Sequence, residues 1–295
     1  MTDNLTVLIT GCKGQLGKCI VDLEPTCENV KFINTDIDEL DITDYDKVYD
    51  FIKKHNINFV VNCAANVDFN DCEEHPDESM VTNAYGPLNL AMAVNKCSNG
   101  YMIHISSDYV FDGKQSVPCS ENDPAYPLSV YGKAKILSEQ MVRYACKKSF
   151  ILRTAWLYSE YGNNFVKTMK KMLNIKDSVS VVFDQVGSPT YARDLAGVII
   201  DIIKNIDTYD SSIYGVYHYS NEGVTSWYDF TKHIQNFYNI DCEVIPIHSD
   251  EFPTKASRPH YSVLDKTKIK NKLNVKIPYW YDSLQKCLIN IKGES

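Results

Sequence analysis

The chain has 295 residues, of which 44% are hydrophobic, and its 30 basic and 38 acidic residues give a formal net charge of −8. Its basic residues occur singly or in pairs, so no basic stripe is present along which a nucleic-acid backbone could lie. No run approaches the ~20 apolar residues of a membrane span, and the polar start lacks a cationic leader or a signal-peptide core. We therefore expect a cytoplasmic globular protein that binds neither nucleic acid nor membrane.

Predicted strands and helices alternate through the first half of the chain. Strands are predicted over residues 5–10, 30–35, 57–65, 101–107 and 150–157, and helices over residues 15–23, 43–55, 77–96 and 129–145. This alternation favours a parallel sheet covered on both faces, which is an α/β, Rossmann-like, doubly wound fold.

The alternation loosens after residue 158, where turns rich in Pro, Gly and Asn separate shorter elements. We expect a first domain over residues 1–158 and a smaller C-terminal lobe made mainly of residues 159–295. Strand-like runs at 179–183 and 216–220 indicate that parts of residues 179–220 return to the main sheet, so that the two lobes are interleaved.

A glycine-rich turn, Gly11-Cys-Lys-Gly14-Gln-Leu-Gly17, follows the first predicted strand. Three-spaced glycines let a backbone turn tightly and approach a pyrophosphate, which the amides and dipole of the next helix also favour. Asp36 ends the next strand, where an acid can bind the adenosine ribose; this favours NADH over NADPH. A purely structural turn, and a solvated acidic loop over Asp36, Asp38 and Asp41, remain the alternatives.

Ser107 and Asp108 end a later predicted strand, and Tyr131 and Lys135 follow one turn apart on a predicted helix. A neighbouring ammonium lowers the pKa of a phenol toward neutrality, so Lys135 would tune Tyr131 as a proton donor while Ser107 binds the same carbonyl oxygen. Lys135 could also hold the nicotinamide ribose. The alternative is surface packing, because a chain with 20 tyrosines can place Tyr and Lys four apart by chance.

Nearly end to end, the sequence resembles the dTDP-4-dehydrorhamnose reductase family of the extended short-chain dehydrogenase/reductases. Eight segments carry the resemblance: residues 11–17, 40–44, 62–65, 106–113, 130–135, 153–156, 162–165 and 184–190. It implies reduction of the C4 keto group of a 6-deoxy-4-keto nucleotide sugar, most specifically of dTDP-4-dehydro-L-rhamnose to dTDP-L-rhamnose, with hydride from NADH or NADPH. The smaller lobe would then be the substrate-binding one.

The resemblance also implies roles for single residues. Cofactor contacts are expected from the glycine turn, from the strand-end loops and from the Tyr/Lys pair: Gly11, Gly14, Gln15, Leu16, Gly17, Asp36, Asp41, Ile42, Ala65, Asn66, Val67, Tyr131 and Lys135. Substrate contacts are expected from Ser107, Asp108 and Trp156. Apart from the resemblance, Arg258 in the second lobe is a candidate phosphate clamp, because a guanidinium can bind phosphate with two hydrogen bonds. Trp156 could instead be core, and Arg258 an ordinary surface ion-pair partner.

This chain departs from the family pattern in two places, with Ser at position 107 where Thr is usual and Cys63 in an alanine-rich stretch. The loop of residues 66–69 is also less standard, which leaves the sugar specificity more open than the reaction type.

Several alternatives stay open. One is an epimerase or dehydratase that recycles its NAD, and another is a regulatory subunit without catalysis. The ten cysteines include no C-x-x-C pair and no cluster with His, so we expect free thiols and place no metal-binding residue. Magnesium, which some family members use, has no ligand cluster here. The nucleotide base and a homodimeric assembly also remain open.

Overall fold

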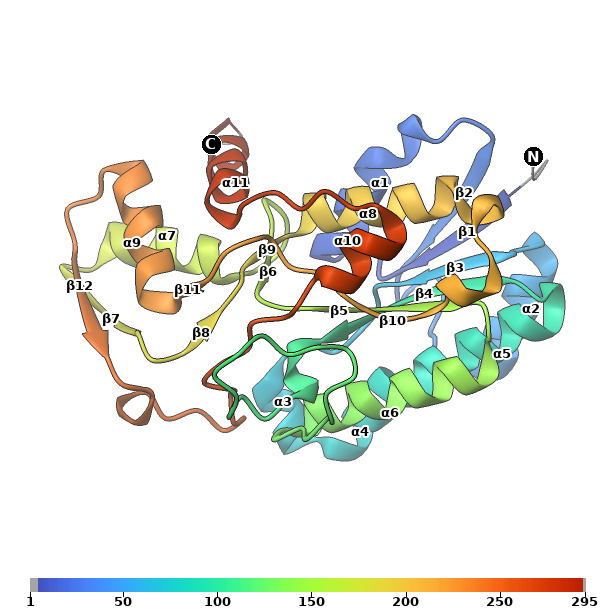
Figure 1. Cartoon of the computed structure of the whole chain (residues 1–295), viewed down its shortest axis with the longest axis horizontal. Helices are drawn as coiled ribbons and strands as arrows, with labels where there is room; N and C mark the ends of the chain where they lie inside the picture. Colours follow the sequence, from blue (N-terminus) through green and yellow to red (C-terminus); the bar gives the residue numbers. More distant parts are fainter. Residues whose placement is uncertain (1–4, 294–295) are drawn as a thin grey trace.

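The computed structural model describes residues 5–293. Its centre is a six-stranded, all-parallel sheet in the order β10-β5-β4-β3-β1-β2 (Figure 1). The strands are β1 (Leu5–Thr10), β2 (Val30–Thr35), β3 (Phe59–Asn62), β4 (Tyr101–Ser107), β5 (Ser149–Thr154) and β10 (Gly215–His218). After β2 the chain crosses to the other side of β1, so the strand order reverses there. Open parallel sheets bind ligands at the carboxyl ends of the strands beside such a reversal.

Helices cover both faces of this sheet. The helices α1 (Gln15–Leu23) and α8 (Ala192–Lys204) pack on one face, and α2 (Tyr45–His55), α5 (Gly86–Ser98) and α6 (Val130–Ala145) pack on the other (Figure 1). Successive residues of β1 face opposite cores: Ile9 packs in one cluster with Ile20 of α1, and Leu8 packs in another with Ile52 of α2. The predicted Rossmann-like, doubly wound fold is confirmed.

A smaller lobe lies at the far end of the molecule from β2 (Figure 1). Here β7 (Ser178–Val182) pairs with β12 (Glu243–Ile247), and α7 (Phe165–Ile175), α9 (Trp227–Tyr238) and α11 (Trp280–Gly293) enclose an apolar cluster of their own. The remaining elements are short: α3 (Phe69–Glu74), α4 (Pro76–Met80), α10 (Thr267–Leu273), β6 (Leu157–Tyr158), β8 (Val186–Gly187), β9 (Thr190–Tyr191) and β11 (Thr225–Ser226).

The observed elements differ from the predicted ones in four places. The strand predicted over residues 57–65 is only Phe59–Asn62 in the structure. The predicted helix over 77–96 is divided into α4, a π-helical turn (Val81–Tyr85) and α5, because Pro87 has no amide hydrogen to continue the ladder. The predicted strand over 150–157 breaks at Trp156, whose φ is +48°. The predicted strand over 216–220 joins the main sheet as β10, whereas that over 179–183 becomes β7 and pairs in the smaller lobe.

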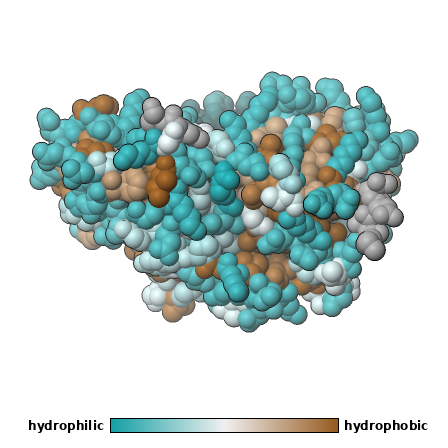
Figure 2. All heavy atoms as spheres, turned by 90° about the horizontal axis from the view of Figure 1, so that it is seen from above, coloured by the Kyte–Doolittle hydropathy of each residue, from teal (hydrophilic) through white to brown (hydrophobic). Residues whose placement is uncertain are grey.

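Within residues 5–293, no helix has the length and the apolar character needed to cross a bilayer. Figure 2 looks onto the side of the molecule that carries α1, α8 and α11, and that side is mostly hydrophilic with apolar areas between the polar side chains.

Candidate active site

The glycine turn between β1 and α1 is packed too tightly for any other residue at two positions. Gly11 has a φ of +68°, and a Cβ there would lie 2.7 Å from the amide nitrogen of Ala64. A Cβ on Gly17 would lie 2.3 Å from the carbonyl oxygen of Gly11. Gly14 caps α1 without any side-chain hydrogen bond, so the first-turn amides have no side-chain partner. This cradle fits a dinucleotide diphosphate.

Asp36 lies against this turn. Its Oδ2 accepts a 2.9 Å hydrogen bond from the amide of Lys13, and its Oδ1 accepts one from the amide of Ile37. The side chain of Lys13 pairs instead with Asp38 and Glu39, at 2.9 and 3.2 Å, on the exposed surface. The solvated-loop interpretation therefore applies to Asp38, while Asp36 is held at the edge of the candidate cofactor site.

Two further loops carry expected cofactor residues, the one between β2 and α2 and the one after β3. Asp41 accepts hydrogen bonds from the amide and hydroxyl of Thr43, and Ile42 is buried beneath Gly86. After β3, Ala65 is half-buried and Val67 is 62% exposed. Between them, the backbone amide of Asn66 donates to Oδ1 of the buried Asn83, and the side-chain amide of Asn83 donates to the carbonyl oxygen of Asn66. Asn83 therefore fixes the backbone of the loop that holds Ala65, Asn66 and Val67, while the side chain of Val67 stays exposed to solvent.

Tyr131 and Lys135 lie one turn apart on α6, and both are buried. The hydroxyl of Ser129 caps the helix by accepting from the amide of Gly132 at 3.1 Å. A Cβ on Gly132 would lie 2.2 Å from the carbonyl oxygen of Tyr109, so this glycine lets α6 approach the turn that follows β4. The alternative of surface packing for the Tyr/Lys pair is excluded by their burial.

Two aromatic rings that sequence reasoning did not single out surround Tyr131. Phe69 stacks on Tyr109 with a 4.5 Å centroid distance, and both rings meet Tyr131 edge-on, at 5.0 and 5.7 Å. Phe69 belongs to the loop noted above as non-standard, and Tyr109 follows Asp108 directly, but the sequence carries no signal that the three rings meet. They form an apolar wall beside the phenol.

Ser107 and Asp108 lie at the carboxyl end of β4, opposite Tyr131. The hydroxyl of Ser107 donates to Oδ1 of Asp108 at 2.9 Å and accepts from the amide of Tyr109. Burial raises the pKa of Asp108 to about 6, although hydrogen bonds from Ser107 and Ser262 act in the opposite direction. Asp108 is thus an acid that titrates just below neutral pH.

The electrostatics of the Tyr/Lys pair correct one expectation. Burial raises the pKa of Tyr131, and the carboxylate of Asp108 raises it further, whereas hydrogen bonding to Ser107 lowers it. Burial lowers the pKa of Lys135 to about 8, while Glu139 acts to raise it. The prediction that Lys135 brings the Tyr131 pKa toward neutrality is therefore wrong, because burial is the larger effect. Tyr131 is a protonated phenol at neutral pH.

A chain of hydrogen bonds runs beneath the site from the end of β1 to α6. Thr10 donates to Asn62 (2.7 Å), Asn62 to Nδ1 of His104 (3.1 Å), Nε2 of His104 to Ser138 (2.8 Å), and Ser138 to the carbonyl oxygen of Lys135 (2.6 Å). Every donor meets an acceptor only if His104 is neutral, and burial lowers its pKa well below the usual value. His104 is a packed core residue that joins the sheet to α6.

Trp156 and Arg258 approach from the smaller lobe's side. Trp156 is half-buried and stacks on Trp227, with a 3.4 Å centroid distance and an 8° interplanar angle. Arg258 is half-buried, has no carboxylate within ion-pair distance among residues 5–293, and acts electrostatically to lower the pKa of Tyr109. The surface ion-pair interpretation of Arg258 is thus wrong.

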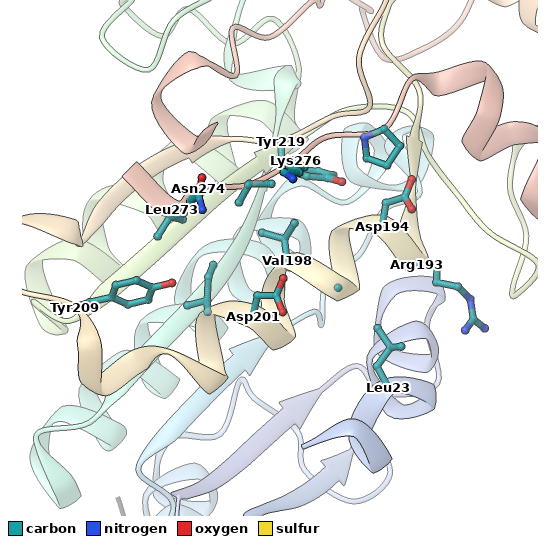
Figure 3. Close-up of a pocket in the computed structure, with 14 residues that line it drawn as sticks. Leu23, Arg193, Asp194, Val198, Asp201, Tyr209, Tyr219, Leu273, Asn274 and Lys276 are labelled. Carbon is teal, nitrogen blue, oxygen red and sulfur yellow. The ribbon is translucent and has the colours of Figure 1, made fainter. Parts of the chain in front are cut away.

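A separate cavity of about 470 Å³ lies on the opposite face of the sheet, between α8 and the segment after α10. Figure 3 shows Asp194, Val198 and Asp201 of α8 on one side of it, with Leu273 and Lys276 on the other. None of the residues discussed above lines this cavity. Within residues 5–293, no group of three or more His, Cys, Asp or Glu side chains could hold a metal ion.

Comparison with known proteins places this geometry in a family. Residues 5–292 match the family model described as RmlD substrate binding domain. The dTDP-4-dehydrorhamnose reductase of Aggregatibacter actinomycetemcomitans is 37% identical over 297 residues, covering 97% of this chain and 98% of that protein. The chain belongs to the dTDP-4-dehydrorhamnose reductase family.

Solved structures of the dTDP-4-dehydrorhamnose reductase family agree closely with this fold. The structure from Clostridium acetobutylicum is 40% identical, has a TM-score of 0.92, and covers 98% of this chain and 100% of its own. The structure from Bacillus anthracis, in complex with NADP, is 37% identical, has a TM-score of 0.90, and covers 97% of this chain and 99% of its own.

Proposed function

We propose that this protein reduces the C4 keto group of a 6-deoxy-4-keto nucleotide sugar with NADPH or NADH, converting dTDP-4-dehydro-L-rhamnose to dTDP-L-rhamnose. The observation that carries the proposal is the meeting of Tyr131 and Lys135 on one buried face of α6 with Ser107 and Asp108 at the end of β4. Relatives at 37–40% identity that bear the reductase name support the same reaction.

The nicotinamide dinucleotide would supply the hydride that reaches C4. Its diphosphate would lie over Gly11, Gly14, Gln15, Leu16 and Gly17, where the three glycines leave room for it and the amides at the start of α1 favour it. The adenosine would lie beside Asp36, Asp41 and Ile42, the loop of Ala65, Asn66 and Val67 would line the site, and Lys135 would bind the nicotinamide ribose. Asp36 favours NADH, whereas the B. anthracis relative binds NADP, so both dinucleotides belong in the assay.

The chain's own contribution is proton delivery and positioning. Tyr131, held protonated by burial, donates its proton to the oxygen on C4, and a developing alkoxide is basic enough to take it. Ser107 hydrogen-bonds the same oxygen. Asp108 is largely ionised above its pKa of about 6 and accepts a hydrogen bond from a sugar hydroxyl. In the smaller lobe, made mainly of residues 159–295, Arg258 would clamp a phosphate of the substrate, and Trp156, at the end of the first domain, would provide an apolar platform.

The assay is oxidation of NADPH and of NADH, followed at 340 nm, across a panel of 4-keto nucleotide sugars that includes dTDP-4-dehydro-L-rhamnose. We expect one equivalent of dinucleotide to be oxidised per sugar reduced. An epimerase or dehydratase would instead turn over sugar with no net change in absorbance, and a regulatory subunit would give no turnover. Either result would contradict the proposal.

A pair of variants tests the proton donor. Tyr131→Phe removes the phenol hydroxyl, and we expect kcat to fall by roughly 100-fold or more, since general acid catalysis contributes at least that much. The matched control is Tyr144→Phe, on the same helix but 82% exposed, which should keep wild-type turnover. Wild-type turnover in Tyr131→Phe would remove Tyr131 from the mechanism.

A further inference from the structure

A buried ion pair lies directly behind the candidate site. Arg153 of β5 donates from Nε and Nη2 to the two carboxylate oxygens of Glu139 on α6, each at 2.8 Å, and these residues are 4% and 2% exposed. The hydroxyl of Ser106 donates to the same carboxylate at 2.5 Å. Nε2 of His218 accepts from Nη1 of Arg153 at 3.3 Å, and its Nδ1 hydrogen is donated to a backbone carbonyl. Every group of this cluster is thus anchored to another.

Stability alone does not account for this arrangement. Removing two charges from water costs about as much as their attraction returns, and apolar replacements of buried pairs are often neutral or stabilising. The position of the pair suggests another use. Glu139 follows Lys135 by one helical turn and Tyr131 by two, and Ser106 directly precedes Ser107. One carboxylate therefore joins the helix that carries the phenol to the strand end that faces it.

Glu139 also faces Lys135 as a countercharge. The other titratable groups near Lys135 are Cys63 in the loop after β3 and His104 on β4, which interact with it electrostatically, and Tyr131, one turn earlier on α6. Burial keeps Tyr131 protonated, raises the pKa of the Cys63 thiol to about 12, and keeps His104 neutral. Of these four groups, Glu139 alone is held by a guanidinium, that of Arg153.

Asp108 is the other buried carboxylate nearby, and it acts on Tyr131 from the end of β4. Arg153 and His218 lie behind Glu139, on β5 and β10, and so belong to the same cluster. Because His218 is neutral, with a pKa that burial and Arg153 lower to about 3, Arg153 is the only cation of the cluster that faces Glu139 from the sheet.

We propose that Glu139 is a positioning residue for the reductase reaction, which provides Lys135 with a buried carboxylate one turn away and fixes α6 against the strand end that carries Ser107. It does this without touching the reacting atoms, through the bidentate pair with Arg153 and the hydrogen bond from Ser106. The inference rests on the proposed function, because the charge of Lys135 matters through the ribose and the phenol.

The first variant is Glu139→Gln, which keeps the shape of the side chain and removes its charge. Loss of the negative charge lowers the pKa of Lys135, so the alkaline limb of the kcat/KM profile should move to lower pH by about one unit, and kcat/KM should fall roughly fivefold at pH 8. KM for the sugar should change less than twofold. The matched control is Glu78→Gln, an exposed glutamate on α4, which should leave the profile unchanged.

A double variant guards against simple unfolding. Glu139→Met with Arg153→Met removes both charges together, so no unpaired charge remains buried, and we expect a melting temperature close to that of the wild type. If the pair were merely structural, this variant would recover the wild-type alkaline limb, which would overturn the proposal. If Glu139 acts on Lys135 as proposed, the alkaline limb of the kcat/KM profile stays at the lower pH although the melting temperature matches that of the wild type.

A direct readout separates this inference from the proposed function. The pKa of Lys135 can be titrated by NMR on protein labelled with ¹³Cε-lysine, with Lys135→Met to assign the signal, and no turnover is needed. A lower pKa in Glu139→Gln supports the proposal, and an unchanged one overturns it. Absence of turnover in the wild type would contradict the proposed function alone, since this titration would still decide the role of Glu139.

Discussion

The side-chain amide of Asn164 donates a 2.9 Å hydrogen bond to Oε1 of Gln15, which joins the cap of α7 to the first residue of α1 across 149 positions of sequence. The hydroxyl of Ser159 donates to the same oxygen at 3.2 Å. Gly162, with a φ of +59°, lets the chain turn beside Gln15. The smaller lobe thus braces the start of the helix that would face the diphosphate.

Asn164→Asp tests this brace. The aspartate can still cap α7 by accepting from the amide of Lys167, but it has no hydrogen to donate to Gln15. The same amide also donates to the carbonyl oxygens of Ser159 and Tyr161, so the aspartate loses three hydrogen bonds in all. The loss of the one to Gln15, about 1 kcal/mol, predicts a three- to tenfold weaker Kd for NADPH, measured by fluorescence titration. Asn174→Asp, at an exposed position on α7, is the control. An unchanged Kd in Asn164→Asp would show that the brace does not reach the cofactor.

Gly17→Ala tests the fit of the glycine turn. Its Cβ would meet the carbonyl oxygen of Gly11 at 2.3 Å and the Cα of Cys12 at 2.7 Å, and both belong to backbone that cannot swing away. We expect a loss of roughly 1–3 kcal/mol in stability and at least about tenfold in NADPH affinity. Gly197→Ala on α8, where a Cβ meets nothing within 4 Å, should instead raise the stability by ~0.5–1 kcal/mol. Differential scanning calorimetry would show the opposite signs.

Asp108→Asn predicts a pH-dependent gain in stability. The folded-state pKa of Asp108 is about 6, above its usual value of 3.8, so the folded protein binds a proton that the unfolded chain has already released between those pH values. Stability is therefore lost as pH rises through this window, by on the order of 2–3 kcal/mol at pH 7. The variant should melt higher than the wild type at pH 7.5 and equally at pH 3.5. A gap that persists at pH 3.5 would have another cause.

Lys135→Met should trade activity for stability. Lys135 is 2% exposed, and burial lowers its pKa to about 8, so the folded state bears the cost of a buried charge below that pH. Methionine avoids this cost, which predicts a gain of roughly 2–3 kcal/mol at pH 7 with kcat/KM at least about 100-fold lower. Because the wild-type lysine loses its proton above pH 8, the gain should shrink toward pH 10. Lys133→Met, exposed on α6, should show neither effect.

The local pattern of the sequence predicts most of the sheet and the helices around it. Buried parallel strands are apolar runs, and the glycine turn after β1 has few other uses, so both are readable without a structure. The expected juxtaposition of Ser107, Tyr131 and Lys135 follows in turn, because Ser107 ends β4 and the other two lie in the first turns of the helix that comes next in the main fold. The brace between Gln15 and Asn164 could not be foreseen, since no local pattern relates residues so far apart.

Burial explains what sequence reasoning missed at the site itself. The spacing of Tyr131 and Lys135 indicates that they are neighbours but says nothing of the desolvation that decides the direction of their pKa shifts. Arg153 lies in a segment that carries the family resemblance, but its ion pair with Glu139 joins β5 to α6. No local sequence pattern relates these two residues, so the pair could not be predicted. Phe69 reaches Tyr131 for the same reason, from a loop whose sequence is less standard.

The stacked indoles of Trp156 and Trp227 provide a built-in optical probe. The rings are 3.4 Å apart and nearly parallel, so their electronic transitions couple. Trp156 follows β5 of the main sheet, whereas Trp227 begins α9 in the smaller lobe. The near-ultraviolet circular dichroism of the folded protein therefore reports the attachment of one lobe to the other. A ligand that contacts Trp156 becomes visible by this signal without any dinucleotide absorbance.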